Sequence, residues 1–266
     1  MIKLFIALTA LFISSCSIGK QITQEENYAD ISILFIGSSY FVYNNLPDIF
    51  EQLTNDVNKN VSIYSCMSNG LFLADHAEKQ KTEDMINQED WDFIVLQGVG
   101  SLMAYPDKIT HHPIKPALIK LQEKIYSNSN STKIVYCLPW AFEDGMTWLE
   151  GWTDNYSDMQ LKIKNNTLEY AEEIGFDIAP VGVAWHTVLQ DQNYPLHYLH
   201  LSDWNHPSMR GSYLMACTIY ATLYQESLED VKYYAGLPEN ETSYFQTVAS
   251  RTVINNLELW NLGNKN

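Results

Sequence analysis

Short apolar runs alternate with longer segments of helical periodicity from residue 31 onward. The apolar runs are rich in Ile and Val and are continuous, which is typical of strands buried on both faces of a parallel sheet. Five segments fit this description and are predicted strands: residues 31–36, 61–66, 93–96, 133–138 and 177–181.

The spacing of apolar positions between and after these strands predicts helices. Strands and helices in steady alternation indicate crossover connections, so we expect an α/β fold, a three-layer α/β/α sandwich with a mostly parallel five-stranded sheet. After residue 181 we expect a short apolar stretch and an aromatic, histidine-rich loop over 192–206. The predicted helices are 47–57, 74–87, 114–127, 157–174 (capped by Ser157), 208–224 and 243–257.

The first 16 residues differ from the rest of the chain. Lys3 precedes an apolar run that is too short to span a bilayer, as in a signal peptide. The run closes with Ile13-Ser14-Ser15-Cys16, which resembles a bacterial lipobox, although an ordinary secretory peptide with a chance cysteine would look similar. We therefore expect a lipid on Cys16, a polar tether over 17–30, a single domain over 31–266, and an extracytoplasmic chain anchored in a bacterial envelope, at the outer membrane.

The chain is strongly acidic, with 16 Lys and Arg against 32 Asp and Glu and a formal net charge of −16. This charge repels phosphate backbones and anionic bilayer surfaces, so we expect no nucleic-acid partner and a substrate that is neutral or only locally charged. Cys66, Cys137 and Cys217 lie in apolar contexts and are expected to be buried free thiols, with one disulfide as the alternative. Because no CxxC spacing occurs, a structural zinc site is unsupported.

Three polar residues carry the candidate chemistry. The first predicted strand ends in a glycine turn that presents Ser39, and in open parallel sheets the site forms at the carboxyl ends of strands. A serine hydroxyl needs a base to take its proton, and His206 is the candidate. Asp203, three residues earlier, can orient this imidazole. Each residue alone has a structural explanation, as a turn or a helix cap, so the prediction of a serine hydrolase rests on the three together.

These segments resemble the SGNH, or GDSL-like, hydrolase superfamily, and within it a group of bacterial envelope proteins. The resemblance covers about residues 31–225 and implies the flavodoxin-like SGNH hydrolase fold. Gly37-Ser38-Ser39 matches the first block of the family with Ser38 as a departure, which implies Ser39 as nucleophile and leaves the Ser38 hydroxyl open. Asp203 and His206 match the last block, Asp-x-x-His, as orienting acid and base.

The same resemblance implies an oxyanion hole. Ser68-Asn69-Gly70 is similar to the second block, which points to the backbone N–H of Gly70, with Asn69 as a neighbouring possibility. Gln97 stands where the third block usually has an asparagine, so its amide is the implied side-chain donor, beside the N–H of Ser39. The implied reaction is ester hydrolysis without a cofactor, on a small-molecule or glycan ester, with removal of O-acetyl groups from an extracytoplasmic carbohydrate favoured.

Two other functions remain open from the sequence. His197, His200, Asp203 and His206 recur every three residues and are all metal-ligand types, which would suit a zinc-dependent hydrolase, although no HExxH signature occurs. Alternatively, the chain is a non-catalytic lipoprotein that binds glycans through its aromatic residues. We expect core or loop packing for Trp140, Trp148 and Trp152, with a sugar site as the alternative. We expect the same for the remaining histidines, although His76 is also a candidate for the rim of the cleft: these are His76, His111, His112 and His186.

Overall fold

The computed structural model of the chain describes residues 31–105, 111–191 and 196–263. The predicted signal peptide, Cys16 and the tether lie outside the described residues. Within the described ranges, no helix is long and apolar enough to cross a membrane.

The five predicted strands form one sheet in the order β2-β1-β3-β4-β5, and every neighbouring pair is parallel. The chain therefore turns to one side of β1 to make β2 and to the other side to make β3. At such a switch point the loops after the strands diverge and leave a crevice at their carboxyl ends. The strands are β1 (Ile31–Gly37), β2 (Val61–Met67), β3 (Phe93–Gln97), β4 (Lys133–Cys137) and β5 (Asp177–Ala179).

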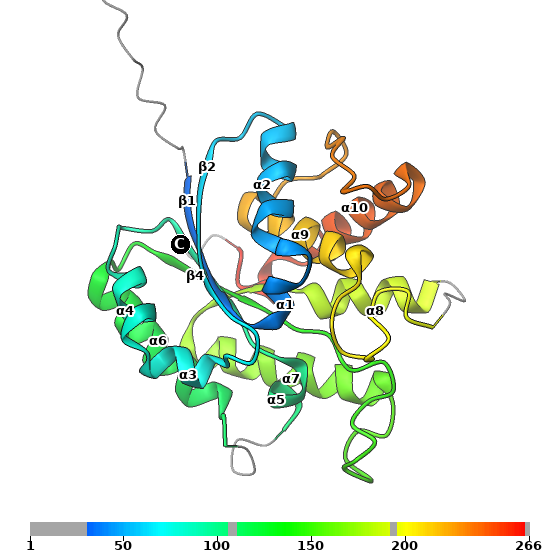
Figure 1. Cartoon of the computed structure of the whole chain (residues 1–266), viewed down its shortest axis with the longest axis horizontal. Helices are drawn as coiled ribbons and strands as arrows, with labels where there is room; N and C mark the ends of the chain where they lie inside the picture. The colour runs from blue at the N-terminus through cyan, green and yellow to red at the C-terminus, as the bar shows by residue number, and fades with distance from the viewer. Residues whose placement is uncertain (1–30, 106–110, 192–195, 264–266) are drawn as a thin grey trace, which may run out of the picture.

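Helices cover both faces of the sheet and give the predicted three-layer α/β/α fold (Figure 1). One layer contains α1 (Ser39–Val42), α2 (Leu46–Asp56), α9 (Met209–Tyr224) and α10 (Glu239–Ile254), with the 3-10 turn Tyr43–Asn45 between α1 and α2. The other contains α3 (Leu73–Glu78), α4 (Gln80–Ile86), α5 (Gly100–Ala104), α6 (Ile114–Asn128) and α7 (Tyr156–Ile174). Helix α8 (Val181–Asp191) contacts α7, α9 and α10, and the 3-10 turn Leu257–Trp260 follows α10.

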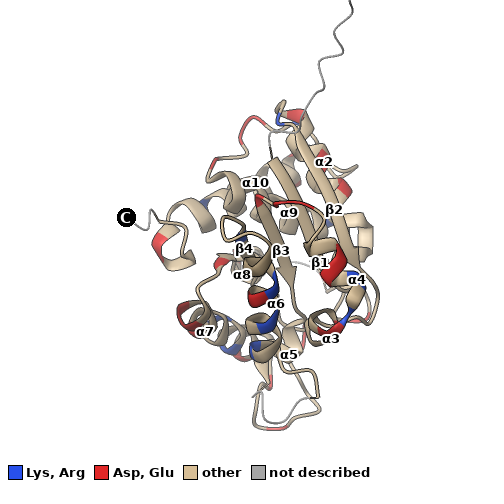
Figure 2. Ribbon diagram, turned by 90° about the vertical axis from the view of Figure 1, so that its left-hand side faces the viewer, with Lys and Arg blue, Asp and Glu red and all other residues tan. Residues whose placement is uncertain are grey.

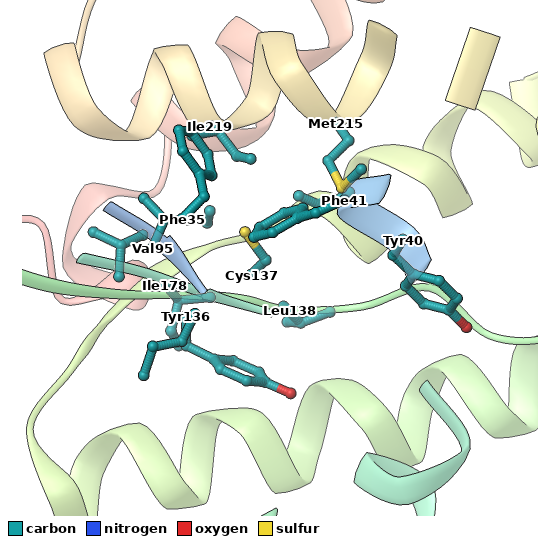
Figure 3. Close-up of a cluster of buried hydrophobic side chains, with 14 of the residues drawn as sticks. Phe35, Tyr40, Phe41, Val95, Tyr136, Cys137, Leu138, Ile178, Met215 and Ile219 are labelled. Carbon is teal, nitrogen blue, oxygen red and sulfur yellow. The ribbon is translucent and has the colours of Figure 1, made fainter. Parts of the chain in front are cut away.

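The core lies on both sides of the sheet, which explains why the strands read as continuous apolar runs. Figure 3 shows Phe35 and Phe41 facing Met215 and Ile219 of α9, whereas Tyr136 points to the opposite side, toward α7. The rings of Phe35 and Phe41 lie edge to face with centroids 5.4 Å apart. This packing fixes the end of β1 against α1.

The described cysteines are buried thiols, as the sequence predicts, and the lysines of α6 pair with acidic residues. Cys66, Cys137 and Cys217 are buried free thiols, and burial raises the pKa of Cys137 and Cys217. In Figure 2 the Lys residues of α6 lie beside acidic residues rather than in a basic face. Three of them form ion pairs that tie α6 to α7, α3 and α4: Lys115–Glu173, Lys120–Glu78 and Lys124–Glu83.

Several predicted boundaries are wrong for local reasons. The single helix predicted over 74–87 is broken at Lys79, whose backbone is extended at φ −84° and ψ 128°. This break brings Thr82 back to His76, whose Nδ1 lies 2.9 Å from the Thr82 hydroxyl. The cap of α7 is Asn155 rather than Ser157, because Asn155 Oδ1 accepts from the N–H of Asp158 at 3.0 Å.

The carboxyl end of the chain shows further differences. The strand predicted over 177–181 ends at Ala179, and the apolar stretch after it is helix α8. Pro207 lies just before α9 and pairs with His200 in a short antiparallel bridge, and Ser208 caps the helix by accepting from the N–H of Gly211 at 3.4 Å. The last helix covers Glu239–Ile254 instead of 243–257. The short helices α1 and α5 are new, since four or five residues are too few to show a helical period.

Candidate active site

The end of β1 places Ser39 at the crevice. Gly37 is the last residue of the strand, Ser38 stands at the N-cap position and Ser39 begins α1. A Cβ added to Gly37 would lie 2.8 Å from the Gln97 amide oxygen and 2.8 Å from the Phe41 ring. Glycine is therefore required here because the neighbouring strand and helix approach the backbone so closely.

Ser39, His206 and Asp203 form one continuous chain of hydrogen bonds. His206 Nε2 lies 2.9 Å from the Ser39 hydroxyl, and His206 Nδ1 lies 2.6 Å from Asp203 Oδ2. The other carboxylate oxygen of Asp203 accepts from the backbone N–H of His206 at 2.9 Å and of Asn205 at 3.1 Å. With Nδ1–H donated to the carboxylate, Nε2 is free to accept the serine proton.

The environment of Asp203 favours its ionised form. Partial burial raises the pKa of this carboxyl, but the hydrogen bonds from the His206 ring and from two backbone N–H groups outweigh burial and lower the pKa below its usual value. The Asp203 carboxylate is therefore charged near neutral pH, as it must be to orient the His206 imidazole.

Ser38 and Ser39 have different surroundings. The Ser38 side chain is buried, and its N–H and hydroxyl lie 2.9 Å and 3.2 Å from Gln97 Oε1. Because the Ser38 N–H can only donate, Oε1 must be the atom that faces it, which fixes the orientation of the Gln97 amide. The structure thus pairs Ser39, not Ser38, with His206.

Gln97 lies beneath the nucleophile turn rather than in the wall of the cavity. Its Nε2 is buried and has no hydrogen-bond partner among the described residues. A buried amide N–H without a partner is rare and costly in a folded protein, so this atom calls for an explanation.

Gly70 reaches the same cavity from the loop after β2. The turn from Ser68 to Leu71 is closed by a hydrogen bond of 3.2 Å between the Leu71 N–H and the Ser68 carbonyl, and Gly70 adopts φ +71°. Glycine adopts this left-handed conformation at no steric cost. The cavity measures about 410 Å³ and is lined by Ser39, Tyr43, Asn69, Gly70, Phe72, Val99, Ser101, Phe142, Asn205 and His206.

Aromatic residues hold the acid–base loop in place. Sequence reasoning expected packing for Trp140, which is buried, but missed its contact with this loop and did not single out Tyr40 or Tyr43. The Tyr40 hydroxyl donates to Asn205 Oδ1, and Trp140 Nε1 donates to the Asn205 carbonyl at 2.8 Å. The rings of Tyr40 and Trp140 stack at 4.3 Å, and Tyr43 stacks on the His206 imidazole at 4.3 Å. No local motif marks these residues, because the contacts join segments more than 60 positions apart.

A second support fixes the other end of this loop. Asn44 Nδ2 donates to the Pro207 carbonyl at 3.1 Å and to the Ser212 hydroxyl at 2.9 Å. Asn44 itself has φ 57°, a left-handed conformation that asparagine tolerates better than most residues. The loop is thus clamped to the segment that follows the nucleophile.

The remaining histidines lie apart from the Ser39–His206 pair. His76 is not at the rim of the cleft: it is buried, with Nε2 3.0 Å from the Gly37 carbonyl, because the broken helix turns its ring under the end of β1. His112 lies on a surface loop 3.9 Å from Asp75, and His186 stacks on Tyr156. His76 and His186 thus have packing roles, as the first of the two sequence alternatives stated.

The histidine spacing does not produce a metal cluster. His197 binds Glu143 through Nδ1 at 2.7 Å, and the buried His200 directs Nε2 to the Ala141 carbonyl at 3.0 Å. Asp203 and His206 are bound to each other. Within the described ranges, no three His, Cys, Asp or Glu side chains are grouped so as to hold a metal ion. The spacing by three reflects a loop, not a helical face.

Comparison with known proteins gives a fold. No family model matches the chain, and no curated protein matches it. Among solved structures, a DUF4886 family protein from Bacteroides uniformis is 18% identical, with a TM-score of 0.68 over 84% of this chain and 95% of that one.

Two further similar structures are described as hydrolases. A candidate SGNH hydrolase from Slackia heliotrinireducens is 22% identical, with a TM-score of 0.59 over 73% of this chain and 98% of that one. An acetylxylan esterase from Geobacillus stearothermophilus is 14% identical, with a TM-score of 0.54 over 79% and 98%. The chain therefore has the fold of SGNH hydrolases, as the sequence resemblance implied.

Proposed function

We propose that the chain is a serine esterase that removes acyl groups, chiefly O-acetyl groups, from a carbohydrate outside the cytoplasm. The observation that carries the proposal is the chain of hydrogen bonds from Ser39 through His206 to Asp203, at 2.9 Å and 2.6 Å. The likeness in fold to hydrolases, one of them an acetylxylan esterase, supports the same reaction class.

In the proposed mechanism, Ser39 Oγ attacks the acyl carbonyl while His206 Nε2 takes its proton. Asp203 holds the Nδ1–H tautomer and stabilises the imidazolium, on which Tyr43 is stacked. His206 then returns the proton to the departing alcohol, and water, activated by the same imidazole, hydrolyses the acyl-serine. No cofactor takes part in these steps.

Three donors are proposed for the oxyanion. The N–H of Ser39 is at the first position of α1, where a helix leaves its N–H groups without internal acceptors. Gly70, which lines the same cavity, would supply the second N–H. Gln97 Nε2 would be the third: it has no partner, and because Gln97 lies outside the cavity wall, this role requires the Ser38–Ser39 turn to shift so that the oxyanion of the tetrahedral intermediate reaches it.

The proposed location rests on the sequence of the first 16 residues. We expect incorporation of labelled palmitate into the full-length chain in bacterial cells, and its loss in Cys16→Ala but not in Cys217→Ala. Equal labelling of wild type and Cys16→Ala would contradict the anchor.

The test of the reaction uses acetylated oligosaccharides and 4-nitrophenyl acetate with wild type, Ser39→Ala, Ser38→Ala and His206→Ala. We expect turnover in wild type, its loss in Ser39→Ala and His206→Ala, and covalent labelling of Ser39 by a fluorophosphonate. Turnover retained in Ser39→Ala but lost in Ser38→Ala would show that Ser38, and not Ser39, is the nucleophile. Absence of turnover and of labelling in wild type would favour the non-catalytic glycan-binding alternative.

A further inference from the structure

A second cavity adjoins the proposed catalytic cavity on the side of Asp203. It measures about 360 Å³, and Phe142 and Asn205 line both cavities. Asp203, whose side chain is 46% exposed, contributes to its wall. The two cavities therefore lie side by side, with Phe142 and Asn205 between them.

Two exposed tryptophans form the walls of this cavity. Trp148 and Trp204 are 59% and 49% exposed, whereas Trp91, Trp140, Trp185 and Trp260 are fully buried. Large aromatic side chains are normally buried, so two exposed indoles in one cavity are unusual. Their placement is outside the core, where neither is needed to fill the space between helices and sheet.

Both tryptophans are held in position rather than left loose. Trp148 Nε1 donates to the Tyr105 hydroxyl at 2.7 Å, and its ring lies 5.5 Å from that of Phe142. Trp204 has φ 62°, a conformation that bulky residues rarely adopt. Hydrogen bonds on both sides of its peptide fix it there, to the Leu201 carbonyl at 2.9 Å and from the Glu143 N–H at 3.0 Å. The indole faces are thus presented in advance of any ligand.

The proposed chemistry decides which part of a substrate meets this cavity. His206 Nε2 must return its proton to the leaving alcohol oxygen, so the alcohol portion of the ester lies on the side of His206. The acyl oxygen must lie on the opposite side, toward Gly70. The second cavity has Asp203, the hydrogen-bond partner of His206, in its wall, and it therefore receives the alcohol portion and not the acyl group.

The walls of the cavity favour a sugar as that alcohol. Indole faces carry negative charge density and bind the weakly positive C–H faces of pyranose rings. The side chains of Asp144 and Thr147, both exposed at the same cavity, can bond sugar hydroxyls. None of the described residues that line either cavity is Lys or Arg, so nothing there pairs with a phosphate or a carboxylate on the substrate.

We infer that the cavity between Trp148 and Trp204 is a subsite for neutral pyranose rings of the alcohol portion, which makes the protein select O-acylated oligosaccharides over simple esters. The inference rests on the proposed esterase function for its orientation, and it adds the place where the sugar binds and the residues that select it. Because stacking recognises the C–H face of a ring and not one pattern of hydroxyls, the subsite accepts more than one pyranose.

The first experiment compares two kinds of ester in the full-length chain. The probes are acetylated xylotetraose and acetylated cellotetraose on one side, and vinyl acetate, whose alcohol is too small to reach the indoles, on the other. We expect the ratio of kcat/KM values, oligosaccharide over vinyl acetate, to fall about tenfold in Trp148→Ala and in Trp204→Ala, mainly through KM. Tyr126→Ala, which removes an exposed ring on α6, is the matched control and keeps the wild-type ratio.

The second experiment measures binding without turnover. Unacetylated xylotetraose and cellotetraose are titrated into Ser39→Ala and into the double variant Ser39→Ala/Trp148→Ala, with tryptophan fluorescence and calorimetry as readouts. We expect saturable binding of at least one sugar in the first and about tenfold weaker binding in the second.

The outcomes separate this inference from the proposed reaction. An unchanged kcat/KM ratio in both tryptophan variants, or no binding of either tetrasaccharide, overturns the subsite even if esterase activity is present. A preference for 4-nitrophenyl octanoate over the acetate that Trp148→Ala removes also overturns it, because the cavity would then hold the acyl chain. If no ester is hydrolysed but tetrasaccharide binding depends on Trp148, the esterase proposal fails and the sugar subsite stands.

Discussion

The two halves of the proposed catalytic centre are held by different kinds of structure. Ser39 follows a buried strand whose backbone is bonded on both sides within the sheet, and Gln97 and His76 bind the residues before it. Asp203 and His206 lie on a loop without regular secondary structure, which is held by side chains from distant segments. The serine is thus positioned by the fold itself and the base by a few specific contacts.

This difference has a consequence for mutation. Removing one packing contact on the serine side leaves the sheet in place, so we expect stability to change more than turnover, except where the lost group is also a proposed oxyanion donor. Removing one contact on the loop side frees the base to move, and misplacing a catalytic group by about 1 Å can cost about 10²-fold in rate. The predictions below separate the two halves and run from the largest expected effect to the smallest.

Asp203→Asn tests the loop side at its most sensitive point. The amide can still occupy the space but offers the His206 ring the wrong hydrogen-bonding partner, so we expect kcat for an aryl acetate to fall about 10⁴-fold. Asp230→Asn, at an exposed carboxylate that lines neither cavity, is the matched control and keeps kcat. A loss below tenfold in Asp203→Asn would show that another group orients the base.

Gln97→Met tests the serine side. The substitution preserves the length of the side chain but removes both the acceptor for the Ser38 N–H and the proposed oxyanion donor. We expect kcat to fall about 10²- to 10³-fold with KM little changed, as for loss of one oxyanion donor. Ser38→Ala, which removes only the hydroxyl bonded to Gln97, separates the two roles and should keep most of the activity. Equal losses in both variants would mean that Gln97 acts only by holding the turn.

Asn205→Ala tests the support of the loop. It deprives the buried Tyr40 hydroxyl of its acceptor, and an unpaired buried polar group costs about 1–3 kcal/mol. We expect the free energy of unfolding to fall by this amount in urea denaturation and kcat to fall about tenfold, since the base is less well placed. Tyr40→Phe removes the same bond without leaving a buried hydroxyl, so its loss of stability should be smaller. If both variants keep wild-type kcat, the clamp does not position His206.

The pH dependence of stability reports on His76 on the serine side. Burial lowers the pKa of His76, and the hydrogen bond to the Gly37 carbonyl offsets this only in part. As the pH falls through about 6.5, His76 of the unfolded chain binds a proton, whereas His76 of the folded chain, with its lower pKa, stays neutral. The stability that this pKa difference contributes is therefore complete above that pH and declines as the pH falls below it. Burial lowers the pKa of His186 and His200 in the same direction.

We expect His76→Gln to flatten the fall in Tm between pH 7 and pH 5 relative to wild type, with a small effect on kcat. Gln88→Ala, at an exposed side chain that does not titrate, should leave the slope unchanged. An identical slope in wild type and His76→Gln would contradict the neutral, buried state of this imidazole.

Much of the sheet could be predicted from sequence because its signal is local. Runs of Ile and Val buried on both faces mark β1, β3 and β4 wherever the chain is read. Helix boundaries were less predictable, because Asn155 competes with Ser157 as a cap and because the break at Lys79 depends on His76 and Thr82 meeting in space.

The same contrast applies to the site. Ser39, Asp203 and His206 could be named because each stands in a short motif, and the structure brings them together. The roles of Tyr40, Asn44 and Trp140 in holding the acid–base loop could not be predicted, because these roles depend on contacts across more than 60 residues of sequence. The orientation of the Gln97 amide likewise follows from the Ser38 N–H in three dimensions and from no spacing along the chain.

The stacked rings beneath the acid–base loop have an optical consequence. Trp140 lies between Tyr40 and Trp185, and the two indoles are nearly parallel, 4.1 Å apart with an angle of 6° between their planes. Transitions of two indoles this close couple and give a strong near-ultraviolet circular dichroism signal. Since Trp140 also donates to the Asn205 carbonyl, release of the loop would disturb that signal. The protein therefore carries an intrinsic spectroscopic probe of whether its base is docked, readable without substrate or label.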